Sequence, residues 1–284
     1  MDCTIALAQI DSSVGNLKNN IEHHLAYIKK AIALKADVVV FPELSLTGYT
    51  LRDVTWDVAL RIGTHPMFKE IEQLSKKITI ITGGVEEAEN FGIYNSAFVF
   101  EDGVMHSAHR KVYPPTYGMF EEQRYFSKGE SVRCFQSKHG KLGILICEDL
   151  WHLPLPYLLA QDGADVIISL TASPTRLSGT EKELSADVVN SEHHKAYSRL
   201  LSSYLVFCNR VGIEDGVTFW GGSQIVSPSG AIITKAKFFD EDIITAHIQE
   251  EEIRRARKFS RHFIDDSPEF TVQQLQLLLQ RKHR

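Results

Sequence analysis

The chain alternates short apolar runs with longer segments in which apolar residues recur every three or four positions. Residues 3–10 and 37–41 are short apolar runs typical of strands, and residues 37–41 are apolar on both faces, as expected of a buried strand. Between them, apolar residues recur at a helical spacing from Asn16 to Leu34. The pattern therefore predicts a strand, a helix and a second strand in this order.

Two later segments have the pattern of β-hairpins. Residues 93–110 form two apolar runs around Asp102-Gly103, a dipeptide typical of tight turns, and residues 221–236 form two runs around the Pro228–Gly230 segment. The other predicted strands are 77–87, 141–147, 164–170 and 204–210, and the other predicted helices are 66–76, 153–163, 181–203 and 268–280.

Hairpins mixed with crossover helices predict two sheets, each covered by helices on one face. The predicted fold class is α/β, a four-layer α-β-β-α sandwich in a single domain that spans residues 1–284. Its core covers residues 2–250, and residues 251–284 form a C-terminal helical extension. The alternation of strands and helices by itself also fits a doubly wound sheet.

Composition excludes several classes of protein. The 284 residues include 36 acidic and 31 basic side chains, a net charge of -5, whereas a nucleic-acid-binding face needs excess positive charge. No apolar run is long enough to cross a bilayer, and residues 1–16 lack the pattern of a signal peptide. We therefore expect a cytoplasmic protein that binds neither nucleic acid nor membrane. The basic run at residues 254–258 is interpreted as a solvated helix face or a subunit contact.

The cysteines and histidines do not form metal-binding patterns. The four cysteines are far apart with no CxxC pair, and Cys3, Cys134 and Cys208 lie in predicted strands, as core residues do. The pairs at residues 23–24 and 193–194 are adjacent on predicted helices, so their imidazoles point in different directions. We expect no metal ion.

Three reactive side chains each follow a predicted strand. Cys147 stands between a strand and a helix, where α/β folds open their ligand crevices, and free backbone N–H groups there favour a thiolate. Glu43 follows the predicted strand 37–41, which is apolar on both faces, and Lys111 directly follows the second strand of the first hairpin. From the residues alone, Cys147 is equally well a small core residue, Glu43 a solvated loop residue, and Lys111 part of a basic surface turn.

The blocks around these residues resemble the nitrilase (carbon-nitrogen hydrolase) superfamily. The segments FPELSLTGY, HRKVYPPTYGMFEEQRYF and ICEDLW follow the order of its Glu, Lys and Cys motifs, and GGSQIVSPSG resembles its late hairpin. Within this superfamily, the blocks CEDLW and YGMFEEQRYF resemble the glutamine-hydrolysing domain of glutamine-dependent NAD synthetases. The resemblance covers residues 2 to about 250.

The resemblance implies roles for individual residues. Glu43 matches the general base, Lys111 the ammonium that stabilises the oxyanion, and Cys147 the nucleophile. A second glutamate of the synthetase branch lies eleven positions after the lysine and matches Glu122, with its neighbour Glu121 as the alternative. The implied substrate-binding residues are Tyr49, Tyr117, Phe120 and Ser173. The backbone N–H of Glu148 is expected to bind the oxyanion, and Trp220, beside the late hairpin, is expected to narrow or reshape the pocket.

This resemblance implies a cysteine-dependent hydrolase that releases ammonia from a small amide through a thioester, with no cofactor. Cys147 is followed by Glu148-Asp149 rather than the Trp-Glu of true nitrilases, which favours an amide, while nitriles and N-carbamoyl compounds stay open as substrates. The chain lacks the SGGxDS phosphate loop of the synthetases. It is therefore expected to act alone or to supply ammonia to a separate enzyme. The resemblance also implies a homodimer or larger homo-oligomer. The remaining alternative is a non-catalytic binding protein.

Overall fold

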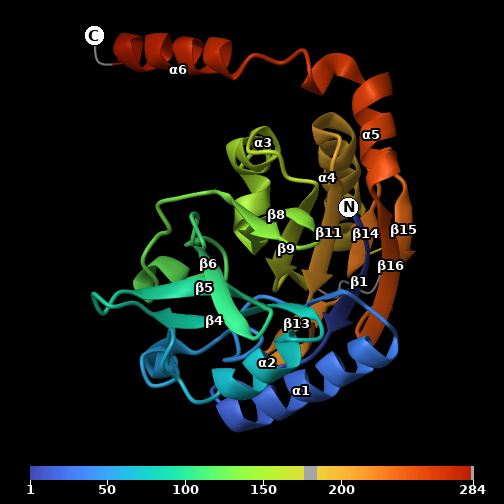
Figure 1. Cartoon of the computed structure of the whole chain (residues 1–284). Helices are drawn as coiled ribbons and strands as arrows, with labels where there is room; N and C mark the ends of the chain where they lie inside the picture. The colour runs from blue at the N-terminus through green and yellow to red at the C-terminus, as the bar shows by residue number, and fades with distance from the viewer. Residues whose placement is uncertain (176–183, 283–284) are drawn as a thin grey trace.

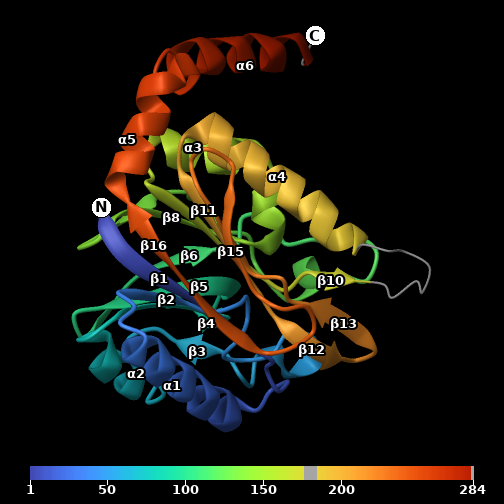
Figure 2. The ribbon, with the colours of Figure 1, turned by 90° about the vertical axis from the view of Figure 1, so that its right-hand side faces the viewer.

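Two main β-sheets form the body of the protein in the computed structural model, which describes residues 1–175 and 184–282 (Figures 1 and 2). The strands of the first sheet are β1 (Asp2–Gln9), β2 (Val38–Val40), β3 (Leu60–Arg61), β4 (Thr79–Glu87), β5 (Ile93–Glu101), β6 (Val104–Arg110) and β16 (Asp242–Gln249). The strands of the second are β7 (Cys134–Ser137), β8 (Gly140–Ile146), β9 (Val166–Thr171), β11 (Tyr204–Asn209), β14 (Gln224–Val226) and β15 (Ile232–Lys235). The mixed α/β fold with two sheets confirms this part of the prediction.

Both sheets combine parallel and antiparallel pairs. The first has the order β16-β1-β2-β4-β5-β6, with β3 also on β4, and the second has the order β15-β14-β11-β9-β8-β7. Their centres, β1-β2-β4 and β8-β9-β11, are parallel. The two predicted hairpins are confirmed as β5–β6 and β14–β15, and the first turns at Asp102 and Gly103, both with positive φ.

The predicted helices are found with small shifts of their ends. They are α1 (Leu17–Ala33), α2 (Phe68–Ser75), α3 (Pro154–Gln161), α4 (Ser185–Leu201) and α6 (Pro268–Lys282). A further helix, α5 (Glu250–Phe259), lies in the predicted helical extension, where the sequence pattern predicts no separate helix. The side chain of Asn16 caps α1 by accepting from the N–H of Asn19, which explains why the helix begins there. The first three residues of the predicted helix 181–203 lie outside the described residues.

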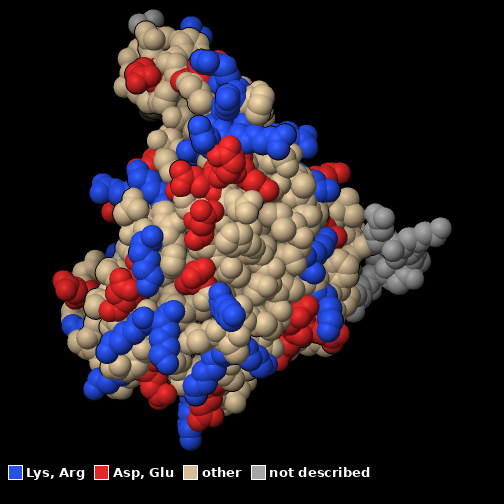
Figure 3. All heavy atoms as spheres, turned by 45° about the vertical axis from the view of Figure 1, so that its right-hand side comes forward, with Lys and Arg blue, Asp and Glu red and all other residues tan. Residues whose placement is uncertain are grey.

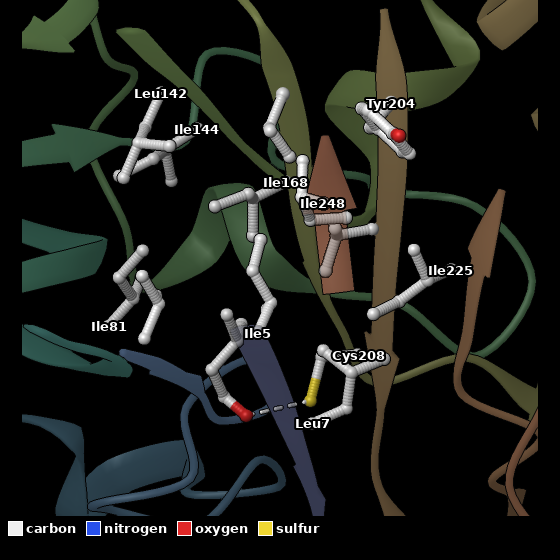
Figure 4. Packing of buried hydrophobic residues seen from close by; sticks show 14 of the residues in the cluster. Ile5, Leu7, Ile81, Leu142, Ile144, Ile168, Tyr204, Cys208, Ile225 and Ile248 are labelled. Atoms are coloured by element: carbon white, nitrogen blue, oxygen red, sulfur yellow. Dashed lines mark hydrogen bonds between the residues drawn. The ribbon is translucent and has the colours of Figure 1, made fainter. Parts of the chain in front are cut away.

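Packing between the sheets excludes the doubly wound alternative. The inner faces of the two sheets pack on each other in one apolar cluster, which includes Ile5 and Leu7 of β1, Ile168 of β9 and Cys208 of β11 (Figure 4). Helices α1 and α2 pack on the outer face of the first sheet, and α3 and α4 on the outer face of the second. Each sheet therefore has helices on one face and the other sheet on its second face.

The number of sheets and the burial of Cys134 differ from the prediction. A small third sheet, β10-β13-β12, joins β10 (Pro174–Thr175), β12 (Val211–Glu214) and β13 (Val217–Trp220), whose strands are too short to give a periodic signal. Cys134 is only half-buried, because it begins the edge strand β7. Helix α6 has no buried residue and extends away from the body (Figure 1). Among the described helices, none is long and apolar enough to span a bilayer.

Candidate active site

Loops after three strands bring Glu43, Lys111 and Cys147 together between the sheets. Glu43 follows β2 and Lys111 follows β6, both in the first sheet, and each is only 1% exposed. Cys147 follows β8 of the second sheet and begins the short 3-10 helix η3 (Cys147–Trp151). The charges of Glu43 and Lys111 both act on the Cys147 thiol, so the three residues predicted from strand ends lie close together, although their backbones belong to different sheets.

Lys111 is the centre of a buried ionic cluster. Its Nζ donates to Oε1 of Glu43 at 2.7 Å and to Oε1 of Glu122 at 2.7 Å. Burial opposes the positive charge, but the carboxylates of Glu122 and Glu43 together raise the pKa of Lys111 well above its ordinary value. The lysine is therefore an ammonium ion at any physiological pH.

The second glutamate of the cluster is Glu122. It is buried at the start of the 3-10 helix η2 (Glu122–Arg124), whereas Glu121 is exposed, so the geometry brings the predicted residue and not its alternative to Lys111. Its Oε1 also accepts from the hydroxyl of Tyr49 at 2.6 Å. Burial raises the pKa of Glu122 to about 7, against the opposing effect of Lys111.

Glu43 is held at both carboxylate oxygens. Its Oε1 accepts from Nδ2 of Asn95 at 2.8 Å as well as from Lys111, and its Oε2 accepts from the backbone N–H of Ala172 at 2.9 Å. Asn95 is fully buried and its Nδ2 also lies 3.4 Å from Oε2 of Glu122. Sequence reasoning missed Asn95, although a polar amide within the apolar run of β5 was a usable signal.

Cys147 has an unusual backbone conformation. Its φ is +47°, in the left-handed region, which costs a residue with a side chain of order 1–3 kcal/mol and is found at many functional sites. Burial, and then the charge of Glu43, raise the pKa of its thiol well above the ordinary value, while Lys111 and the Ala172 N–H act in the opposite direction. The resting sulfur is therefore a thiol that needs a base before it can attack.

Aromatic side chains lie beside the cluster, where the resemblance implies substrate contacts. Tyr49 and Phe120 meet edge to face, with ring centroids 6.5 Å apart, and together with Glu122 they line a cavity of about 250 Å³. Tyr117 is exposed, packs on Phe120, and donates from its hydroxyl to Oε2 of Glu148 at 2.7 Å. These side chains form a continuous wall from Glu122 to Glu148.

Trp220 is placed differently from the expectation. Its indole has no exposed surface, packs on Phe207 and Phe238, and donates from Nε1 to Oγ of Ser173 at 3.1 Å. Ser173 is partly exposed, and its N–H donates to Asn209 Oδ1 at 2.8 Å. The indole therefore has no surface in an open pocket, and the contact through which it would shape the substrate site is its hydrogen bond to Ser173.

Histidines of the helices take structural positions. His24 is fully buried under the Glu43 loop, with Nδ1 2.7 Å from the Asn20 carbonyl and Nε2 3.0 Å from Ser45 Oγ. His194 is buried beside Gln224. Within residues 1–175 and 184–282, no group of three or more His, Cys, Asp or Glu side chains is arranged to hold a metal ion.

Fold and site together define a class of protein: an α/β fold of two packed sheets, with a thiol beside a buried carboxylate–ammonium pair. The sequence pattern of the carbon-nitrogen hydrolase family matches residues 4–258. The chain belongs to this family, as the resemblance implied, and is one of its enzymes.

Similar proteins include a synthetase longer than this chain and two hydrolases of about its length. A glutamine-dependent NAD(+) synthetase of Thermotoga maritima is 31% identical over 87% of this chain, which spans only 42% of that protein. A carbon-nitrogen hydrolase of Helicobacter pylori has a TM-score of 0.85 at 24% identity, with 97% of this chain and 99% of that chain covered. An amidase variant from Nesterenkonia, in which an acetamide moiety is attached covalently to the active-site cysteine, has a TM-score of 0.77 at 19% identity over 95% and 96% of the two chains.

Proposed function

We propose that this chain is an amidase-type hydrolase that releases ammonia from a small amide, with Cys147 as its nucleophile. The observation that carries the proposal is the contact of one ammonium group with two carboxylates beside a thiol. Because Glu43 and Glu122 both lie 2.7 Å from Lys111 Nζ, the lysine stays charged in a buried position where it can stabilise developing negative charge.

The first half-reaction forms a thioester. Glu43 removes the proton from Cys147, whose sulfur attacks the carbonyl carbon of the amide and turns its oxygen into an oxyanion. Lys111 and the backbone N–H of Glu148 stabilise this oxyanion, and losing one such donor typically costs about 3–4 kcal/mol of transition-state stabilisation. Glu43 then returns the proton to the nitrogen, the C–N bond breaks, and ammonia leaves.

The second half-reaction regenerates the enzyme. Glu43 takes a proton from water, and the resulting hydroxide attacks the thioester carbon. The C–S bond breaks, the sulfur recovers its proton from Glu43, and the carboxylic acid product leaves. Every proton in this scheme moves through Glu43, so the reaction needs no metal ion or organic cofactor.

Substrate-contacting side chains favour a small polar amide. Tyr49 and Phe120 offer an aromatic wall beside Glu122. Glu148 directly follows Cys147 in the chain, and Ser173 follows Ala172, whose backbone N–H donates to Glu43. An amidase with an adduct on its cysteine shares the fold, which supports an amide as the substrate. Nitriles and N-carbamoyl compounds are the alternative substrates, because the same thiol can attack their carbon atom and the same ammonium can stabilise the negative charge that develops.

A second candidate function is that of a glutaminase serving a separate synthetase. Its support is the 31% identity to a glutamine-dependent NAD(+) synthetase, of which this chain spans 42%. In this case ammonia release from glutamine is expected to increase when an ATP-using partner binds. Full glutamine hydrolysis by the purified chain alone would count against it.

Replacement of Cys147 by alanine tests the nucleophile. We expect Cys147→Ala to abolish ammonia release from whichever compound the native protein hydrolyses, in a panel of glutamine, asparagine, ω-amides of keto acids, N-carbamoyl compounds and aliphatic nitriles. Cys134→Ala is the matched control, since Cys134 is a half-buried cysteine on the edge strand β7, and should keep full activity. Ammonia release that survives Cys147→Ala would exclude the proposed mechanism.

A further inference from the structure

The loop of Lys111 and the loop of Cys147 are joined by one carboxylate, that of Asp149. Asp149 is fully buried and lies two residues after Cys147 in η3. Its Oδ1 accepts from the backbone N–H groups of Val112 and Tyr113, at 3.0 and 2.9 Å, which are the two residues after Lys111. Its Oδ2 accepts from the backbone N–H of Ile146 at 3.2 Å.

A fourth bond comes from the other side of Lys111. His109 lies two residues before the lysine, its side chain is only 8% exposed, and its Nε2 donates to Oδ2 of Asp149 at 3.0 Å. Residues before and after Lys111 are thus bonded to one group in the Cys147 loop. The side chain of Asp149 accepts four donors, and only an ionised carboxyl has the lone pairs to accept them all.

The same carboxylate supports the strained backbone at Cys147. Asp149 Oδ2 accepts from the backbone N–H of Ile146, the residue before Cys147, and Asp149 itself is two residues after Cys147. Cys147 therefore lies inside a short loop that is closed by the hydrogen bond between Ile146 and Asp149. This bond stabilises the positive φ of 47° at Cys147. The bonds to residues 112 and 113 fix the Lys111 backbone relative to this loop.

We propose that Asp149, with His109, is a positioning residue that holds the Lys111 ammonium at the distance from Cys147 that oxyanion stabilisation requires. This inference rests on the proposed hydrolase function. A displacement of about 1 Å in a catalytic group can reduce the rate about 100-fold. The bonds of Asp149 connect two loops that each carry such a group, so breaking these bonds should have a large effect on kcat. Asp149 touches neither the reacting atoms nor Lys111 Nζ in the bonds described, and it acts only through the two backbones.

The matched control is a second buried carboxylate far from the site. Glu101 at the end of β5 is 5% exposed and accepts from Thr79 Oγ1 at 2.7 Å, Ser137 Oγ at 2.5 Å and the Lys138 N–H at 3.1 Å. Both Asp149→Asn and Glu101→Gln put an amide where several donors point, and both should therefore lower the melting temperature. Only the first should affect catalysis.

The experiment compares kcat and KM of the native protein, Asp149→Asn and Glu101→Gln below the melting temperature of all three. We expect Asp149→Asn to lower kcat about 100-fold with KM changed less than about threefold, and Glu101→Gln to leave kcat within about twofold. An unchanged kcat in Asp149→Asn, or an equal loss in Glu101→Gln, would overturn the proposal.

His109 provides a test that does not depend on the folding of Asp149→Asn. His109→Leu removes one donor to Asp149 and should lower kcat about tenfold, whereas His109→Gln keeps an N–H donor at a similar reach and should restore most of it. A loss in His109→Gln as large as that in His109→Leu would contradict positioning through this bond, because a packing role depends on shape and not on the donor.

A substrate-free readout separates this proposal from the proposed function. Lys111 favours the Cys147 thiolate, so displacing it should slow alkylation of Cys147 by iodoacetamide at pH 8 at least threefold in Asp149→Asn and not in Glu101→Gln. If the native protein hydrolyses no compound of the panel, the proposed function is refuted. Slower alkylation in Asp149→Asn would still support the proposal that Asp149 positions Lys111 relative to Cys147. An unchanged alkylation rate in Asp149→Asn would overturn this positioning role of Asp149 even if the native protein is active.

Discussion

At the scale of single residues, the site depends on a charge balance among three buried groups. One ammonium, Lys111, lies between the carboxylates of Glu43 and Glu122, and none of the three is more than 5% exposed. Removing one partner of such a buried pair is strongly destabilising, because the groups that remain have lost both water and their counter-charge. The same residues thus govern stability and catalysis.

Replacing Lys111 by methionine should reveal both roles. We expect Lys111→Met to lower kcat by a factor of about 100 to 1,000 and to lower the free energy of unfolding at pH 8 by about 3–5 kcal/mol. Without the lysine, the pKa of Glu122, which burial already raises to about 7, rises further in the folded state, because the charge of Glu43 is then unopposed. The folded variant therefore binds protons that the unfolded chain has already released, and its deficit in stability should shrink as the pH falls from 8 to 5.

Urea unfolding at these two pH values measures the effect. Lys138→Met is the control, since Lys138 pairs with Asp102 at 2.7 Å on the surface, where both side chains are more than a third exposed. It should change the free energy of unfolding by less than about 1 kcal/mol. A deficit in Lys111→Met that is the same at pH 5 and pH 8 would contradict the charge balance described above.

At the scale of elements, helix α1 supports the Glu43 loop through a buried histidine. His24 of α1 stacks on Phe41, with centroids 4.3 Å apart, and its Nε2 lies within hydrogen-bonding distance of Ser45 and Thr82. Burial lowers the pKa of His24 from 6.5 to about 3. The helix thus depends on a neutral imidazole for its contact with the loop after β2.

Acid should weaken this contact in a defined pH range. Between pH 6.5 and about 3 the unfolded chain binds a proton at His24 that the folded protein does not, so stability decreases as the pH falls through this range. The loss is about 1.4 kcal/mol for each pH unit below 6.5. In His24→Gln, which does not titrate, we expect a free energy of unfolding that is lower at pH 7 but changes less between pH 6.5 and 4.5.

The control for this prediction is His23→Gln, the adjacent residue on α1. His23 is partly exposed and its pKa is raised by Glu241, so its proton stabilises the folded state, and removing it should make the acid-dependent loss steeper, not shallower. Chemical unfolding over the pH series distinguishes the two. Equal slopes in the native protein and His24→Gln would show that His24 is not responsible.

At the scale of the whole molecule, the C-terminal extension is the part with the least internal support. Helix α6 has no buried residue, and Leu275, Leu278 and Leu279 are each more than half exposed. Figure 3 shows Lys and Arg side chains gathered beneath this helix. Helix α5, which precedes it, carries the four basic residues of the 254–258 run, for which a solvated face or a subunit contact is expected. An exposed row of leucines is expected to be covered by another surface.

We propose that this extension contributes to a homo-oligomer. Light scattering should give a mass at least twice the 32.1 kDa of the chain, and Leu275→Glu combined with Leu278→Glu should reduce it. Gln274→Glu is the control on the same helix, because Gln274 is exposed and polar already. A native mass of 32 kDa would refute the prediction.

Local patterns predicted most of the elements but not all of their contacts. The hairpin turn at Asp102-Gly103 and the start of α1 at Asn16 depend on neighbouring residues, so the sequence was sufficient for them. The half-buried Cys134 and the third sheet depend on where strand edges lie, which strand propensity does not specify. For Trp220, the sequence could place a large side chain near the late hairpin but not determine its direction.

The sequence by itself determined the kinds of side chain at the site and their positions at strand ends, because motif and periodicity are local properties. Only the tertiary structure decided which groups touch: that Asn95 joins Glu43, that Glu122 and not Glu121 reaches Lys111, and that Asp149 binds the backbone beside the lysine. These contacts link segments up to 52 residues apart, and the distance between two such segments is fixed by the packing of the sheets.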